Sequence, residues 1–366
     1  MKQNERMKRE LVRSRRTGVQ PVVDLLFKEI SNLIEEARER TAAAVNTELT
    51  VLYWHIGNRI RRDALAEKRA EYGKKIVYSL SIQLTSRFGK GFSDRALFQM
   101  MRFAEACPDE QIVYSLSRQL SWTHMRQLIY IEDPLKREFY TELCRHERWS
   151  VRVLQDKIQG MLYERTGISR KPAELARKEL VALRKEDRMT PDLVFRDPYL
   201  LDFLGLQDTF SEKDLESAIL HSLEQFIIEF GKDFAFIARQ KRITVDSDDY
   251  YIDLLFYHRG MQRLVAIDLK LGKFQAADKG QMELYLRWLD KYERRRGERS
   301  PLGLILCAGK SNEHVELLQL QKTGIRVAEY LTELPPKKLL IKKLQEAIGT
   351  ARERLAQRQL SEKTTP

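Results

Sequence analysis

The chain has 366 residues, of which 43% are hydrophobic and 32% are charged. This composition is typical of a folded globular protein and excludes a mostly disordered chain or a collagen-like fibre. The length suggests roughly two or three domains. The 65 Lys and Arg residues exceed the 53 Asp and Glu residues, for a formal net charge of +12. This excess favours polyanionic partners, nucleic acid first among them.

The sequence contains no run of about 18 apolar residues, so we expect no membrane-spanning segment. The three cysteines lie far apart without metal-binding spacing, which is typical of reduced thiols in a cytoplasmic protein. Residues 1–19 are basic but lack the apolar core of a signal peptide, and we expect a basic arm there.

Residues 20–166 have the pattern of a helical domain. Apolar residues recur every three or four positions in its first part, and Ser93, Ser121 and Ser150 each precede another amphipathic segment as predicted N-caps. Short basic helices joined by tight turns are typical of helix-turn-helix modules, although a plain packing domain fits the spacing equally. We expect this domain to bind DNA or to mediate dimerisation.

A charged stretch with several prolines, residues 167–197, is predicted to be a linker. After it, Ser211 and Asp214 form a capping-box pattern for a helix that is predicted to end at Gly231.

Strand-like runs and further helices then alternate, which predicts an α/β domain with a mixed sheet over residues 198–345. A C-terminal helix and tail are expected over residues 346–366. The whole chain is therefore predicted to be a two-domain α+β protein with an all-α N-terminal domain.

The most informative segment is YYIDLLFYHRGMQRLVAIDLKLGKF, in which two apolar strands flank a short turn. If Gly260 and Met261 form a two-residue turn of the primed class, with glycine at the first central position, Asp253 lies directly opposite Asp268. Side chains alternate faces along a strand, so Lys270 shares the face of Asp268. We therefore expect these three side chains to converge, whereas a three-residue loop would break the parity.

Two neighbouring carboxylates among apolar residues are costly unless cations neutralise them. Lys270 supplies one positive charge, and Mg²⁺ or Mn²⁺ bound by Asp253 and Asp268 would supply the rest. Such an ion polarises a phosphate and activates an attacking water, so the triplet favours phosphodiester hydrolysis. The alternative is a structural ion-pair cluster on a sheet face.

Three further residues bear on this choice. Glu216 lies early in the helix before the sheet, where it could reach the same ion, although an acid there also suits the helix dipole. Gln281 and Tyr285 are four positions apart on a later helix and so share a face. They could hold a phosphate or stack on a base, or they could form a polar edge beside Trp288.

The ordered set Glu216, Asp253, Asp268-Leu269-Lys270 and Gln281-x-x-x-Tyr285 resembles the PD-(D/E)xK nuclease superfamily with the QxxxY element of its RecB-type branch. The segments LESAILHSL and GQMELYL are similar to the YhcG-type family, and GFSDRALFQMMRF and LSWTHMRQLIYI are similar to that family's helical domain. The resemblance covers about residues 20–345. The family commonly has Glu where this chain has Asp268, which keeps the carboxylate but shortens its reach.

This resemblance implies a restriction-endonuclease-like C-terminal domain and a Mg²⁺-dependent deoxyribonuclease, with Mn²⁺ as a possible substitute. DNA is the expected partner, with RNA as an open alternative, and we expect a homodimer. A non-catalytic nucleic-acid-binding or recruitment module that uses a nuclease-like fold is the second hypothesis. The implied roles are metal ligation by Asp253, Asp268, Glu216 and the Leu269 carbonyl, base or charge-stabiliser chemistry by Lys270, and substrate orientation by Gln281 and Tyr285.

Overall fold

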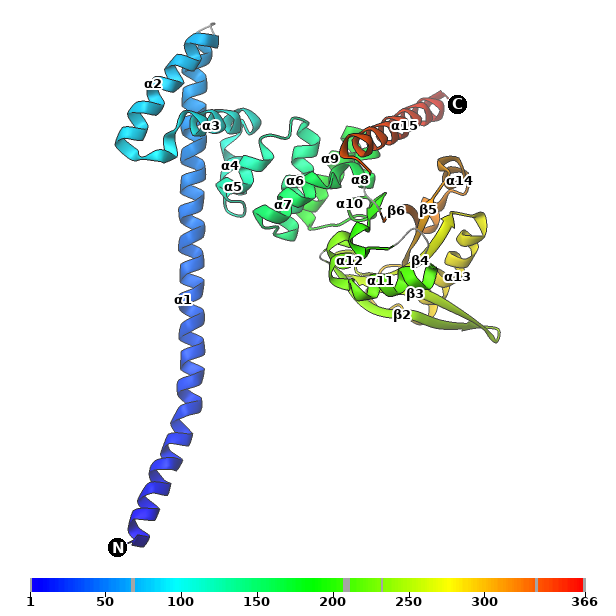
Figure 1. Cartoon of the computed structure of the whole chain (residues 1–366), viewed down its shortest axis with the longest axis horizontal. Coiled ribbons are helices and arrows are strands. Elements are labelled where there is room, and N and C mark those ends of the chain that lie inside the picture. Colours follow the sequence, from blue (N-terminus) through cyan, green and yellow to red (C-terminus); the bar gives the residue numbers. More distant parts are fainter. Residues whose placement is uncertain (1, 67–69, 207–210, 232, 333–334, 365–366) are drawn as a thin grey trace. The chain divides into compact units, whose positions relative to one another are not determined.

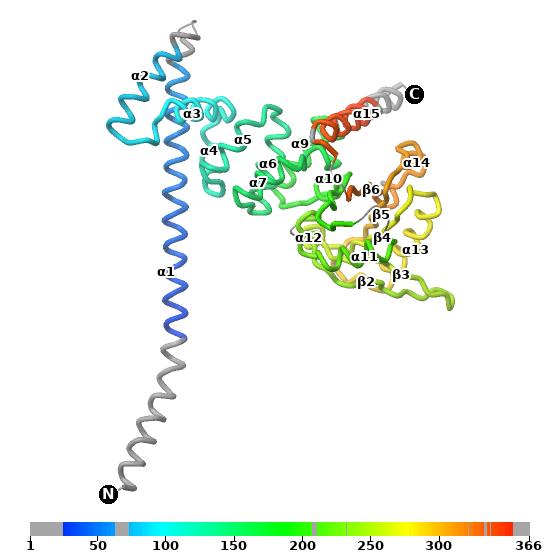
Figure 2. The backbone as a smooth tube through the Cα atoms, in the orientation of Figure 1, coloured from blue at the N-terminus to red at the C-terminus, as the bar shows by residue number. Residues whose placement is uncertain are grey.

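Figures 1 and 2 show the computed structural model of the chain. The chain divides into two compact units, Met1–Tyr130 and Ile131–Pro366. The described part of the first unit is helical, and the second unit combines helices with a mixed sheet, so the chain is an α+β protein as predicted. The structure describes residues 2–66, 70–206, 211–231, 233–332 and 335–364.

The first unit is built on one long helix, α1, against which the shorter helices pack. Trp54 of α1 is buried, and its Nε1 donates a hydrogen bond to the Cys107 carbonyl at 2.7 Å. A Cβ on Gly57 would lie 1.9 Å from the Met100 carbonyl oxygen, so only glycine permits this close crossing of helices. The elements are α1 (Lys2–Ala66), α2 (Ala70–Phe88), η1 (Lys90–Phe92), α3 (Asp94–Ala106), α4 (Glu110–Ser117) and α5 (Trp122–Leu128).

The predicted N-caps Ser93, Ser121 and Ser150 are confirmed. Each serine hydroxyl accepts a hydrogen bond from the backbone N–H three positions later, at the starts of α3, α5 and the helix Val151–Gln159. These caps satisfy N–H groups that have no partner within their own helix.

The second unit begins with helices and continues into a sheet. Its helical elements are α6 (Pro134–Glu147), α7 (Val151–Gln159), α8 (Leu162–Arg165), η2 (Gly167–Arg170), α9 (Ala173–Glu186), α10 (Pro191–Val194), η3 (Asp202–Leu204), α11 (Glu212–His221), α12 (Leu223–Phe230), α13 (Ala276–Tyr292), α14 (Asn312–Leu317), η4 (Leu320–Thr323) and α15 (Lys337–Thr364). The strands are β1 (Tyr199–Leu200), β2 (Phe234–Val245), β3 (Asp248–His258), β4 (Arg263–Lys273), β5 (Leu302–Gly309) and β6 (Ile325–Leu331).

The sheet has the strand order β1-β6-β5-β4-β3-β2. Strands β2, β3 and β4 are antiparallel neighbours, whereas β4, β5, β6 and β1 run parallel to one another. The sheet is therefore mixed, as predicted, and β4 is its central strand with neighbours on both sides.

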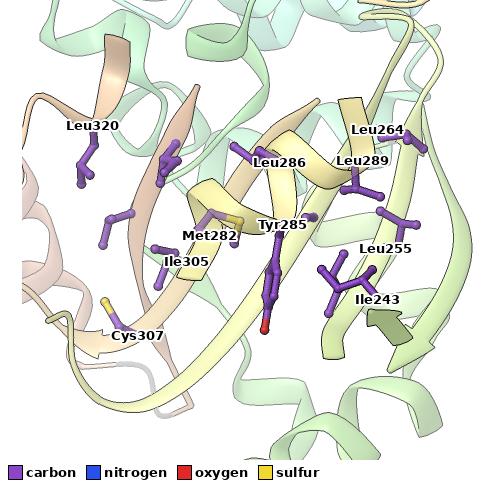
Figure 3. Packing of buried hydrophobic residues seen from close by; sticks show 14 of the residues in the cluster. Ile243, Leu255, Leu264, Met282, Tyr285, Leu286, Leu289, Ile305, Cys307 and Leu320 are labelled. Carbon is purple, nitrogen blue, oxygen red and sulfur yellow. The ribbon is translucent and has the colours of Figure 1, made fainter. Parts of the chain in front are cut away.

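Helices cover both faces of this sheet. On one face α13 packs on β4 and β5, and Figure 3 shows Met282, Tyr285, Leu286 and Leu289 among buried strand residues such as Leu255. On the other face the aromatic rings of α12 stack against β3, with the Phe230 and Phe256 rings 6.3 Å apart. Because β4 is covered on both faces, most of its side chains are apolar.

The register predicted for the β3–β4 hairpin is confirmed. Leu254 pairs with Ile267 and His258 pairs with Arg263. Continuing this register by one position places Asp253 opposite Asp268.

The class of turn predicted for this hairpin is wrong. Gln262 N–H donates to the Arg259 carbonyl at 3.2 Å, and the left-handed backbone lies at Gln262 (φ 53°) rather than at Gly260. A Cβ on Gly260 would lie 2.7 Å from Asp233 Oδ2, so this glycine permits a close approach instead of a primed turn. The parity survives because the loop still contains an even number of residues.

Two further expectations are corrected. The helix predicted to run from Ser211 to Gly231 is divided into α11 and α12 at Ser222, where the backbone leaves the helical region (φ −109°, ψ 33°). The capping box of Ser211 and Asp214 and the end at Gly231 are as predicted. The first two strand-like runs after Gly231, FAFIARQ and RITV, form one strand, β2, whose pairing with β3 contains a register shift near Phe236.

Residues 167–197, expected as a linker, contain η2, α9 and α10, and Ile168 and Leu180 are fully buried there. The basic arm expected at residues 1–19 falls in the part of α1 whose side chains lie outside the described residues. Residues 346–364, expected as a C-terminal helix and tail, continue α15. Among the described helices, none is both long enough and apolar enough to cross a membrane.

Candidate active site

The β3–β4 hairpin brings Asp253, Asp268 and Lys270 together on one face of the sheet. Lys270 Nζ lies 3.0 Å from Asp268 Oδ2, and both side chains come from β4, two positions apart. Asp253 reaches across from β3, where its Oδ2 accepts a hydrogen bond from Leu269 N–H at 2.8 Å. The convergence predicted from strand parity is therefore present.

Burial makes this group of charges unusual. Asp268 is only 2% exposed, and burial raises its pKa strongly, with the negative charge of Asp253 adding to the effect and Lys270 opposing it. Burial likewise raises the pKa of Asp253, although hydrogen bonds from Leu269 N–H and the Gln240 amide act against the shift. The two acids carry more negative charge than one ammonium group neutralises.

The Lys270 side chain is 22% exposed. Burial alone would lower its pKa, but the negative charge of Asp268 outweighs that effect, and the pKa of Lys270 is raised. Lys270 is therefore a firmly protonated ammonium group in the metal-free protein, with part of its surface open to a ligand.

Glu216 of α11 is joined to this group by Gln240, a residue that was not predicted from the sequence. Gln240 Nε2 donates to Glu216 Oε2 at 2.6 Å and to Asp253 Oδ1 at 3.0 Å. The other oxygen of Glu216 lies 3.7 Å from Arg239 Nε. Gln240 carries no sequence signal, because its place beside Asp253 depends on the pairing of β2 with β3.

Gln281 and Tyr285 of α13 lie next to Lys270 in a chain of contacts. Lys270 Nζ is 3.5 Å from Gln281 Oε1, Gln281 Nε2 donates to the Tyr285 hydroxyl at 2.5 Å, and that hydroxyl donates to the Tyr251 carbonyl at 2.9 Å. Tyr285 is 1% exposed and packs in the core, so its ring offers almost no surface for stacking on a base. It fixes the amide of Gln281, which faces Lys270.

Glu212, one turn before Glu216 on α11, is a second residue that the sequence analysis did not single out. Its Oε1 accepts a hydrogen bond from Leu271 N–H at 3.3 Å, directly after Lys270. The spacing of four residues between Glu212 and Glu216 could have indicated a shared helix face. Its negative charge adds to the field around Lys270 and Asp253.

The donor set fits a hard divalent cation. Carboxylate oxygens are the ligands that Mg²⁺ and Mn²⁺ prefer, and the buried Asp268 Oδ2 has no hydrogen-bond partner besides its ion pair with Lys270. In the part of the chain that the structure describes, no three His, Cys, Asp or Glu side chains already stand together as a preformed metal cage. The residues that could hold such an ion are Asp253 and Asp268, and Glu216 is linked to Asp253 through the Gln240 amide.

The fold and this site define a nuclease of the PD-(D/E)xK type, and comparisons with known proteins agree. The family profile "DUF1016 N-terminal domain" matches residues 29–165, and "YhcG PDDEXK nuclease domain" matches residues 192–347. The Escherichia coli (strain K12) protein named "Putative nuclease YhcG" is 33% identical over 348 residues, which cover 86% of this chain and 92% of that relative. The chain belongs to the YhcG family of PD-(D/E)xK nucleases.

Two solved structures are similar to this chain over about a third of its length. A repair endonuclease from Pyrococcus abyssi is 21% identical with a TM-score of 0.25, over 36% of this chain and 50% of that one. EndoMS in a complex with double-stranded DNA is 16% identical with a TM-score of 0.26, over 36% of this chain and 49% of that one.

Proposed function

We propose that the protein is a metal-dependent nuclease that hydrolyses phosphodiester bonds of DNA, with Asp253, Asp268 and Lys270 as its central catalytic group. One observation carries this proposal. The half-buried Asp253 and the buried Asp268 both have raised pKa values, and they lie beside the single ammonium group of Lys270. A structural ion pair needs no second acid, whereas a cation-binding site does.

Asp253 and Asp268 would hold Mg²⁺ or Mn²⁺, together with Glu216 and the Leu269 carbonyl. When bound, such an ion polarises the scissile phosphate and lowers the pKa of the attacking water. Lys270 would stabilise the negative charge that develops on the phosphate, or donate a hydrogen bond that orients the attacking water. Gln281, fixed by Tyr285, keeps the Lys270 ammonium pointed at this position and contacts the substrate.

DNA is the proposed substrate because the chain carries an excess of 12 positive charges, which suits a polyanion. RNA shares that charge, so the substrate test includes both nucleic acids. We also propose a cytoplasmic location, as expected from the sequence.

A homodimer is the proposed assembly. Each chain carries one set of Asp253, Asp268 and Lys270, so two copies would be needed to cut both strands of a duplex at one place. In support, α1 presents exposed apolar side chains on one face at helical spacing, among them Leu26 (48% exposed), Ile30 (53%) and Leu33 (63%). Apolar surface of this kind favours a packed partner helix.

The experiment that tests the activity uses the purified full chain with labelled single-stranded DNA, duplex DNA and RNA, in Mg²⁺, Mn²⁺ or chelator. We expect cleavage of DNA only when the divalent ion is present, and loss of cleavage in Asp253→Asn and Asp268→Asn. Asp249→Asn is the matched control, because Asp249 lies on β3 in an exposed pair with Arg242 away from the site. Metal-independent binding without cleavage of any substrate would favour the non-catalytic module instead.

A further inference from the structure

Gln240 of β2 lies between two acids, Glu216 of α11 and Asp253 of β3. Its Nε2 lies 2.6 Å from Glu216 Oε2 of α11 and 3.0 Å from Asp253 Oδ1 of β3. Ionised carboxylates only accept hydrogen bonds, so the amide must present its nitrogen and not its oxygen to both of them. One neutral side chain therefore links two acids that would otherwise repel each other.

The backbone at Gln240 is unusual for a strand. Its φ is 45°, in the left-handed region that residues other than glycine rarely adopt. Arg239 pairs with Leu254 and Lys241 pairs with Ile252, so Gln240 lies across from Asp253. The alternation of exposed and half-buried side chains along β2 also breaks here, where Gln240 and Lys241 are both half-buried. Local distortions of this kind commonly re-aim a side chain next to an active site.

The contacts of Asp253 leave its carboxylate available to a ligand. One oxygen accepts from Gln240 and the other from Leu269 N–H, so both oxygens are oriented from outside while each keeps a second lone pair. Groups that orient ligating carboxylates in this way tune the metal without touching it.

From this geometry we infer that Gln240 is a positioning residue, which holds the Glu216 and Asp253 carboxylates side by side for the divalent ion. The inference rests on the proposed metal-dependent function, since it assigns Gln240 a role toward that ion. Gln240 contributes no charge, so it holds the acids together without competing with the ion as another cation would.

The test measures Mn²⁺ affinity of the full chain by electron paramagnetic resonance, with no substrate present. Loss of the amide in Gln240→Ala should weaken Mn²⁺ binding about 10- to 100-fold. Gln240→Asn is too short to reach both acids and should show a smaller loss. The control is Arg242→Gln, also on β2, which should bind Mn²⁺ like the wild type because Arg242 pairs with Asp249 outside the site.

A variant of the same shape separates positioning from a merely structural role. Gln240→Glu puts a third carboxylate between the other two, so the metal-free protein should melt at a lower temperature than the wild type. Saturating Mn²⁺ should then raise the melting temperature of Gln240→Glu by more than it raises that of the wild type. A structural role alone would lower the melting temperature without changing the response to Mn²⁺.

The outcomes distinguish the inference from the proposed function. Wild-type affinity for Mn²⁺ in both Gln240→Ala and Gln240→Asn would overturn the role of Gln240 and leave the metal-dependent nuclease standing. Failure of the wild-type protein itself to bind Mn²⁺ would overturn the metal-dependent function and this inference with it.

Discussion

The ammonium group of Lys270 lies 3.0 Å from Oδ2 of Asp268, and both side chains project from the central strand of the sheet. Asp268 is almost completely buried, whereas the Lys270 side chain keeps 22% of its surface exposed. The buried member of this pair is suited to hold an ion, and the partly exposed member is suited to meet a phosphate.

Replacing Lys270 by methionine should therefore remove activity and retain the fold. Methionine keeps most of the apolar stem but lacks the ammonium group, so we expect the cleavage rate to fall about 10²- to 10⁴-fold. Single-turnover cleavage of labelled DNA measures this loss. The matched control is Lys273→Met near the end of the same strand, where the side chain is exposed. Equal rates for Lys270→Met and wild type would exclude a catalytic role for the lysine.

Metal binding should depend on pH through Asp268. Burial raises the pKa of this acid above its ordinary value of 3.8, so in the metal-free protein the carboxyl keeps its proton to a higher pH than an exposed Asp does. An entering ion must displace that proton, and Mn²⁺ affinity should rise with pH between about pH 5 and about pH 7. Calorimetric titration in two buffers of different ionisation enthalpy would detect the released proton. Constant affinity without proton release would contradict the prediction.

A second buried charge cluster supports the fold of the second unit. Glu229 of α12 pairs with Arg165 and Arg196, whose side chains are 2% and 4% exposed. Glu229→Gln leaves both guanidinium groups without their counter-charge, and we expect a loss of about 3–5 kcal/mol in the free energy of unfolding. Glu224→Gln, at an exposed position on the same helix, should change it by less than about 0.5 kcal/mol. Urea unfolding compares the two variants.

The same cluster predicts the response to acid. Burial opposes ionisation of Glu229, but Arg196 and Arg165 outweigh it and hold the pKa at about 2, below the ordinary value of 4.5. Because the folded-state pKa is lowered, the stabilisation is present above pH 4.5 and is lost as the pH falls toward 2. Glu229→Gln should remove this part of the acid sensitivity. If the free energy of unfolding fell equally with pH in the wild type and in Glu229→Gln between pH 4.5 and about 2, Glu229 would not be a source of the acid sensitivity.

Removal of exposed apolar side chains from α1 should weaken the proposed dimer. The triple variant Leu26→Ala, Ile30→Ala and Leu33→Ala keeps good helix formers but removes exposed apolar surface. We expect the dimer dissociation constant to rise at least about tenfold by sedimentation equilibrium, with unchanged circular dichroism. Leu317→Ala, which removes another exposed leucine on α14, should leave it unchanged. A wild-type protein that sediments as a monomer would exclude the homodimer.

The sequence predicted the centre of the site because strand parity is a local property. The register of the β3–β4 hairpin depends on one short loop, so the convergence of Asp253 with Asp268 and Lys270 could be derived by counting. The turn class could not, because Gly260 is required by the approach of Asp233 from outside the hairpin.

The sequence could place Glu212 on the helix face of Glu216, but the contacts that Gln240 and Glu212 make with the neighbouring strands could not be predicted from it. Gln240 meets Asp253 through the pairing of β2 with β3 and a left-handed residue within the strand. Glu212 meets Leu271 through the packing of α11 beside β4. Both contacts depend on tertiary structure, which no spacing along the chain encodes.

The most direct test of the central claim is anomalous diffraction from a crystal of the full chain soaked in Mn²⁺. We expect one strong anomalous peak within coordination distance of carboxylate oxygens of both Asp253 and Asp268, and no such peak in Asp268→Asn. An anomalous peak elsewhere, or none at these two carboxylates at a Mn²⁺ concentration that supports cleavage, would contradict it.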